Sequence, residues 1–176
     1  LISDKKIDFS RYSYFYAKYL NSIGEKKVAK KIIIDTLKTY PRNLLLNQYK
    51  IDLERPKKTF DFNCREKTHV VAEIIYITAN ALSSQTFYKL SNFYLNLSKY
   101  LNQDFLAYDT LLAENFYKIK DFDKSKKIYE KLINYGNAFK WYSNQQISRI
   151  LIQEEQKEKS LKLLSKSFNE LSNKGI

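Results

Sequence analysis

The stretch Leu106–Asn137, LAYDTLLAENFYKIKDFDKSKKIYEKLINYGN, decides the fold. On both sides of a polar turn at Lys120 and Asp121, apolar residues recur at spacings of three and four, which is the pattern of amphipathic helices. Ala113 and Ser125 place small side chains where two such helices would cross. The stretch therefore predicts one helical hairpin, with bounds at about residues 105–135.

Similar patterns predict three more hairpins, at about residues 8–40, 69–101 and 138–171. In the first, the helical spacing is carried by Phe9, Tyr12, Tyr16, Tyr19, Leu20 and Ile23. Gly24 interrupts the helical pattern between the two helices of this hairpin. The second helix ends at Pro41, because proline cannot continue a helix interior. An extra helix is expected at about 44–54. Residues 55–68 lack a helical period and contain Pro56, so we expect a loop there.

Small residues recur at matching places in the four hairpins, at internal spacings of 12 and 7 residues. Eleven of the twelve positions hold Ala, Ser or Thr, and the twelfth holds Leu132. In chain order the triplets are Ala17, Ala29, Thr36; Ala79, Ser91, Ser98; Ala113, Ser125, Leu132; and Ser148, Ser160, Ser167. Because helices approach to about 8–10 Å, a small residue at each crossing lets them pack closely. We expect the small residues to lie where helices pack closely, and the helix around Leu132 to stand slightly farther from its neighbour than its counterparts do.

The composition favours helices throughout. The chain has 176 residues, 44% of them hydrophobic, but only three Gly and two Pro, too few turn residues for a β-rich fold. We expect an all-α protein in which the hairpins stack as an α-solenoid, since one hairpin cannot bury its apolar face alone. Residues 1–176 would form a single helical-repeat domain. The chain has no Met, and we expect it to be a fragment of a longer, bacterial array.

The small triplets, Leu112, Phe116, Tyr129 and the turn DFDKS at Asp121–Ser125 resemble the tetratricopeptide repeat (TPR) family, whose unit is also a helix-turn-helix of about 34 residues. The resemblance implies a scaffold that binds a peptide or protein partner in a groove lined by the first helix of each unit. By register, the groove residues would be Arg11, Tyr14, Lys18, Asn21, Glu73, Tyr76, Asn80, Thr110, Glu114, Tyr117, Lys118, Tyr142, Gln145 and Arg149. The alternative for the tyrosines is packing against neighbouring helices.

Some TPR proteins hold a carboxylate with Lys and Asn one turn apart. Here the residue four positions after Lys18 is Ser22, and Glu114 adds a negative charge to the groove, so we do not predict that mode.

The sequence offers little for catalysis. Cys64 and His69 are the only Cys and His, and a dyad between them would lack an orienting partner. Asp121, Asp123 and Glu130 could resemble metal ligands, but their placement at a helix turn favours helix capping and interaction with the helix dipole. We therefore expect a non-catalytic protein without metal or cofactor. An enzyme or an accessory domain of one is the least favoured class.

The formal net charge is +12, and residues 1–68 carry twice as many basic as acidic residues. A basic helical-repeat module that binds RNA is therefore the alternative function. Lysines far outnumber arginines, which favours solvated helix faces over bidentate phosphate recognition. No apolar run of about 18 residues is present, so we expect a soluble protein, cytoplasmic or periplasmic. The partner itself is not specified.

Overall fold

The computed structural model describes residues 9–54 and 62–172, and these residues are helical apart from turns and short connections. Compact packing divides the chain into two units, Leu1–Lys58 and Thr59–Ile176. The all-α prediction is confirmed for the described residues. The expectation of a single continuous domain stays a prediction.

The first unit contains α1 (Ser10–Ser22), α2 (Lys26–Thr39) and α3 (Leu44–Glu54), and each of the three packs against the other two. Ala17 and Ala29 are fully buried where α1 meets α2. Tyr14 of α1 contacts Tyr49 of α3 edge to face, with 5.4 Å between ring centroids. The unit thus has a core between its three helices.

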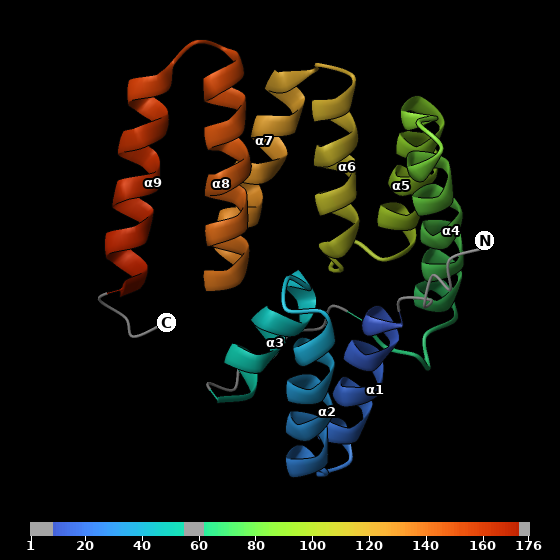
Figure 1. Cartoon of the computed structure of the whole chain (residues 1–176). Coiled ribbons are helices and arrows are strands. Elements are labelled where there is room, and N and C mark those ends of the chain that lie inside the picture. Colours follow the sequence, from blue (N-terminus) through green and yellow to red (C-terminus); the bar gives the residue numbers. More distant parts are fainter. Residues whose placement is uncertain (1–8, 55–61, 173–176) are drawn as a thin grey trace, which may run out of the picture. The chain divides into compact units, whose positions relative to one another are not determined.

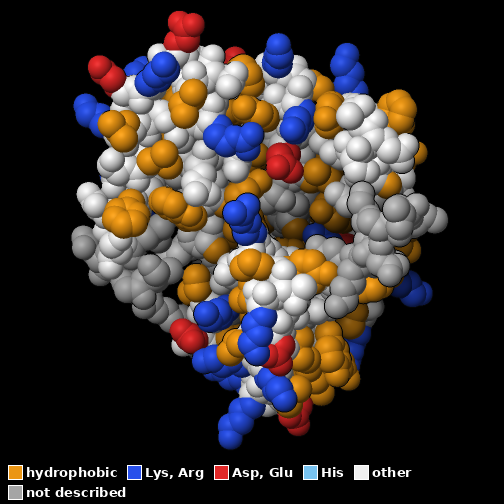
Figure 2. All heavy atoms as spheres, viewed as in Figure 1, with side chains coloured by type: hydrophobic (Ala, Val, Ile, Leu, Met, Phe, Trp, Pro, Cys, Tyr) orange, Lys and Arg blue, Asp and Glu red, His pale blue; other side chains and the backbone are white. Residues whose placement is uncertain are grey.

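The apolar spacing of α1 is helical as predicted, but it marks an exposed stripe. Of the residues that carry it, only Leu20 is buried, and the others are 43–58% exposed: Phe9, Tyr12, Tyr16, Tyr19 and Ile23. The buried face of α1 consists instead of Ser10, Tyr14, Ala17 and Leu20. Figure 2 shows hydrophobic side chains gathered on the part of this unit where Figure 1 places α1.

The second unit contains six α-helices in its described part: α4 (Lys67–Ser84), α5 (Tyr88–Leu101), α6 (Ala107–Lys118), α7 (Phe122–Leu132), α8 (Asn137–Gln153) and α9 (Lys157–Ser172). The short 3₁₀ helix η1 (Ile133–Tyr135) joins α7 to α8. Each helix packs against the next along the chain, and consecutive helices run in opposite directions (Figure 1). These helices match the predicted hairpins to within a few residues. The extra helix at 44–54 is α3, and the described part of the predicted loop, residues 62–66, is not helical, whereas α4 already starts at Lys67.

The small-residue positions are buried. Eleven of the twelve have at most 4% of their surface exposed, Leu132 included, and Thr36 is half-buried. In the second unit the first and second positions of each hairpin touch. Ser91 Oγ donates a hydrogen bond to the Ala79 carbonyl at 2.7 Å, and Ser125 Oγ donates to the Ala113 carbonyl at 2.9 Å. In the last hairpin the hydroxyls of Ser148 and Ser160 bond to each other.

The four hairpin turns share one backbone conformation. Seven residues after the first small position, the chain adopts a positive φ, at Gly24 (90°), Thr86 (67°), Lys120 (63°) and Glu155 (61°). The following N–H donates to the carbonyl five residues earlier in all four turns, at 2.8–2.9 Å, from Glu25, Phe87, Asp121 and Gln156. This is the Schellman ending of a helix. The spacing of the hairpins is therefore repeated in burial, in hydrogen bonds and in turn geometry.

Asp121 caps α7 as predicted. Its carboxylate accepts the N–H of Lys124 at 3.3 Å and the Nζ of Lys124 at 2.7 Å. These contacts, with the hydrogen bond to the lysine side chain first among them, lower the pKa of the Asp121 carboxyl. The acid therefore stabilises a helix N-terminus.

Candidate functional site

Among the predicted groove residues of the first unit, Tyr14 lies against Tyr49 of α3. Tyr14 is 3% exposed, and Lys18 Nζ lies 5.7 Å from the centre of its ring. Burial lowers the pKa of Lys18 to about 8, although the Asp52 carboxylate acts in the opposite direction. Burial also raises the pKa of Tyr49 to about 12, and Asn21 lowers it by a hydrogen bond. Tyr14 and Lys18 thus belong to the packing of this unit, whereas Asn21 is exposed and reaches it only through its hydrogen bond to Tyr49.

Arg11, the fourth predicted residue of this unit, is half-buried. Its guanidinium lies 5.6 Å from the centre of the Phe15 ring, one turn along α1.

In the second unit the predicted residues lie on α4, α6 and α8, the first helices of the three hairpins. Two rows repeat at the hairpin spacing. The first row is exposed on all three helices and consists of Asn80, Glu114 and Arg149. The second row, one turn earlier on each helix, consists of Tyr76, Thr110 and Gln145, of which Tyr76 and Thr110 are half-buried and Gln145 is exposed. The exposed row presents an amide, a carboxylate and a guanidinium in order.

The structure brings Glu114 and Arg149 to the same tyrosine. Tyr142 is half-buried, and its ring packs against that of Tyr129 with 5.9 Å between centroids. Burial, and next the Glu114 carboxylate, raise the pKa of Tyr142 to about 12, while Arg149 acts in the opposite direction. The guanidinium of Arg149 also covers the ring of Tyr117 on α6 at 5.0 Å. The result is a joined polar and aromatic surface on α6 and α8.

Other predicted residues play smaller parts in this surface. Glu73 is only 6% exposed, so it is buried and does not contribute to the exposed surface. The Tyr76 ring lies against Tyr108, with 5.4 Å between centroids, and Thr110 Oγ1 donates to the Ala107 carbonyl of its own helix. Lys118 is exposed at the end of α6. The predicted tyrosines of this unit are half-buried, as the alternative of packing against neighbouring helices predicts. The predicted residues of this unit that are exposed are Asn80, Glu114, Lys118, Gln145 and Arg149.

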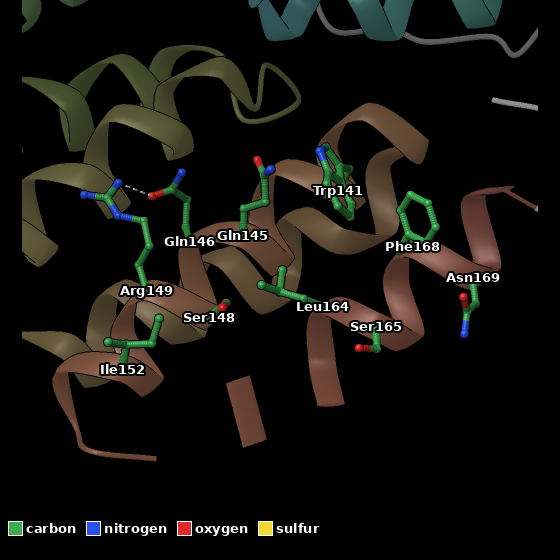
Figure 3. A pocket seen from close by; sticks show the side chains of 10 residues that line it. All are labelled: Trp141, Gln145, Gln146, Ser148, Arg149, Ile152, Leu164, Ser165, Phe168 and Asn169. Carbon is green, nitrogen blue, oxygen red and sulfur yellow. Dashed lines mark hydrogen bonds between the residues drawn. The ribbon is translucent and has the colours of Figure 1, made fainter. Parts of the chain in front are cut away.

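The residue pattern did not predict a groove between α8 and α9. Its volume is about 720 Å³, and it is lined by Trp141, Gln145, Gln146, Ser148, Arg149, Ile152, Leu164, Ser165, Phe168 and Asn169. Figure 3 shows Trp141 and Phe168 near each other at one end of this α8–α9 groove, and Arg149 with Ile152 at the other. Arg149 Nη1 donates to Gln146 Oε1 at 2.8 Å. The lining residues of α9 do not form a motif in the sequence, because the groove arises from the packing of α8 against α9.

Cys64 and His69 have different environments. Cys64 is exposed. His69 Nδ1 accepts the backbone N–H of Asn63 at 3.1 Å, and its ring lies 6.1 Å from that of Phe62. These contacts hold the segment before α4 onto that helix. Across the described ranges, no group of three His, Cys, Asp or Glu side chains is placed to hold a metal ion, and no helix is long and apolar enough to cross a membrane.

Comparison of the sequence with models of known protein families finds no match, and comparison with curated proteins finds none either.

Proposed function

We propose that the chain is a non-catalytic α-solenoid of TPR-like hairpins that binds a peptide or protein partner. The repetition of buried small residues, hydroxyl–carbonyl bonds and Schellman turns supports the solenoid. The observation that carries the binding function is the row Asn80, Glu114 and Arg149, exposed on three successive first helices. Amide, carboxylate and guanidinium groups in a row, next to tyrosine rings, can hold an extended peptide or a helix by hydrogen bonds and aromatic contacts.

A comparison of two triple variants tests this function. The first, Asn80→Ala/Glu114→Ala/Lys118→Ala, removes exposed side chains from α4 and α6. The control, Lys127→Ala/Glu130→Ala/Lys131→Ala, removes exposed side chains from the second helix α7. Residues 1–176 of each form are immobilised, and the proteins retained from an extract of the cells that produce this protein are identified by quantitative mass spectrometry. We expect a protein that binds the wild type and the control but not the first variant. Equal retention by all three would contradict the proposal.

An RNA-binding module is the second candidate, because the first unit combines exposed cations with exposed aromatic rings. Lys26, Lys27, Lys30 and Lys31 are exposed on α2, although Lys30 also pairs with Glu54 at 3.1 Å. The exposed rings of α1 could stack on unpaired bases. This function requires affinity for single-stranded RNA that falls steeply as salt rises. Absence of binding at low ionic strength would eliminate it.

A further inference from the structure

The second helices of the three hairpins in the second unit, α5, α7 and α9, share an exposed stripe of residues. In each helix the stripe lies one position before, two positions after and six positions after the buried serine that contacts the first helix, which is Ser91, Ser125 or Ser160. Spacings of three and four residues put these positions on one side of a helix. All nine residues at these positions are exposed. We call each set of three the outer stripe of its helix.

The outer stripe is apolar on α5 and basic on the other two helices. On α5 it consists of Leu90, Phe93 and Leu97, whose exposed fractions are 48%, 62% and 38%. On α7 and α9 every position of the stripe is a lysine: Lys124, Lys127 and Lys131, then Lys159, Lys162 and Lys166. One compact unit therefore presents three apolar and six basic side chains at equivalent positions of its repeat.

Exposed apolar side chains are concentrated on the hairpin of α4 and α5. Beside the outer stripe, Tyr100 of α5 is 75% exposed, and on α4 the residues Val70, Ile74 and Ile77 are 38–59% exposed at helical spacing. In contrast, none of the large apolar side chains of α6 and α7 is exposed. Glu73 is the only acidic residue of α4 and α5, and because it is buried, neither helix exposes an acidic side chain. An exposed apolar patch of this kind marks an interaction surface.

The lysines of the outer stripes can meet an anionic surface. Among the described residues, only Lys124 of these six lysines forms an ion pair, with Asp121 at 2.7 Å. The exposed acids of the same two helices, Asp123, Glu130 and Glu158, lie outside the stripes. The whole chain has a formal net charge of +12, which attracts it to anionic surfaces over a longer range.

We propose that the outer stripes bind the surface of a membrane that contains anionic lipids. The apolar side chains of α5 enter the boundary between headgroups and acyl chains, and the lysines of α7 and α9 lie against the anionic headgroups. A bilayer suits side chains that protrude from successive hairpins, because it adapts to them and needs no complementary pocket.

Two other occupants fit the outer stripes less well. RNA would leave Leu90 and Leu97 without a favourable contact, because leucine neither stacks on bases nor pairs with phosphate. A second copy would bring the six lysines of one chain close to the six of the other, because a symmetric dimer contact joins the same surface of both copies. The inference goes beyond the proposed function, since the row Asn80, Glu114 and Arg149 lies on the first helices and the outer stripes lie on the second.

Cosedimentation of residues 1–176 with unilamellar vesicles tests the proposal. We expect binding to vesicles of phosphatidylcholine mixed with phosphatidylglycerol, weaker binding to phosphatidylcholine alone, and a loss of affinity as salt rises. In Leu90→Gln/Phe93→Gln/Leu97→Gln the affinity should fall at least about tenfold. The matched control, Ile152→Gln/Leu161→Gln/Phe168→Gln, removes three exposed apolar side chains elsewhere on the unit and should keep the wild-type affinity. Helical circular dichroism of both variants should match the wild type, because all six side chains are exposed.

A second pair of variants separates the lysine stripes from the net charge. Lys127→Gln/Lys131→Gln/Lys162→Gln/Lys166→Gln should weaken binding to the anionic vesicles about tenfold or more and leave binding to phosphatidylcholine unchanged. The control removes four exposed lysines from the first unit, Lys26→Gln/Lys27→Gln/Lys31→Gln/Lys50→Gln, so both variants carry the same net charge. The control should lose clearly less affinity.

Four results would overturn the inference. The first is undiminished affinity in the Leu90→Gln/Phe93→Gln/Leu97→Gln variant, and the second is an equal loss in the two lysine variants, which would reduce the effect to net charge. The third is absence of vesicle binding at low ionic strength. The fourth is concentration-dependent self-association without vesicles that is lost in the α5 variant, which would make a second copy the occupant. None of these variants changes the row proposed to hold a protein partner, so vesicle binding and partner retention fail separately.

Discussion

Lys120 has a backbone conformation that residues other than glycine rarely adopt. It closes the turn between α6 and α7 with φ at 63°, in the left-handed region that side chains with a Cβ disfavour. Thr86 and Glu155 occupy the same position in their turns, and only Gly24 suits it. The sequence could not reveal this cap at three of four places, because Thr, Lys and Glu are not residues that signal it.

Replacing Lys120 by Gly is therefore expected to stabilise the chain by about 0.5–1 kcal/mol, since the strain is removed and the side chain is exposed. The matched control is Lys127→Gly in the interior of α7, where the same exchange should destabilise by about 1 kcal/mol. Urea unfolding monitored by circular dichroism measures both changes. A loss of stability in Lys120→Gly would show that the turn does not have the left-handed conformation.

Lys18 gives the first unit a pH dependence. Its pKa is lowered by burial to about 8, against 10.5 for an ordinary lysine. Between these values the unfolded chain binds a proton that the folded chain does not, so the free energy of unfolding rises with pH. Above pH 10 the raised pKa of Tyr49, about 12, acts in the opposite direction, because its unfolded form then loses a proton first.

We therefore expect the stability of the wild type to rise more steeply from pH 8 to pH 10 than that of Lys18→Met, as measured by urea unfolding at each pH. Lys27→Met, on the exposed side of α2, serves as the control and should keep the wild-type slope. Identical slopes in the wild type and Lys18→Met would refute the burial of the Lys18 ammonium group.

At the scale of helices, the small residues set how closely each pair packs. Ala113 has no exposed surface, and its carbonyl accepts the Ser125 hydroxyl of the facing helix. Ala113→Phe should force α6 and α7 apart and cost roughly 1–3 kcal/mol, which lowers the thermal midpoint by several degrees. Glu114→Phe, one residue along and exposed, is the control and should change the midpoint little. Equal midpoints for the two variants would contradict the packing register.

The helices and their small positions could be predicted from spacing because both follow from local periodicity. The buried face of α1 could be predicted only in part. Ala17 is buried as its small-residue position predicts, but the aromatic residues with helical spacing are exposed and Tyr14 is buried instead, since α2 and α3 pack on that side. The positions of Asn80, Glu114 and Arg149 on the first helices could be predicted from the repeat register. The α8–α9 groove could not, because it depends on how the side chains of two helices pack.

For the whole molecule, we propose that the second unit is one hairpin repeated three times. The exposed residues Lys89, Asp123 and Glu158 occupy the same place in α5, α7 and α9. In a stack, one constant step separates neighbours, and the outer pair lies farther apart than either inner pair. If the three hairpins were not repeats of one another, the distances between these three positions would follow no such order.

The most direct test is pulsed electron paramagnetic resonance between spin labels at pairs of these three positions, with Cys64 replaced by Ser. If the hairpins stack as repeats, the 89–123 and 123–158 distances agree closely and the 89–158 distance exceeds both. Clearly different inner distances, or an outer distance no longer than an inner one, would contradict the stacked repeat.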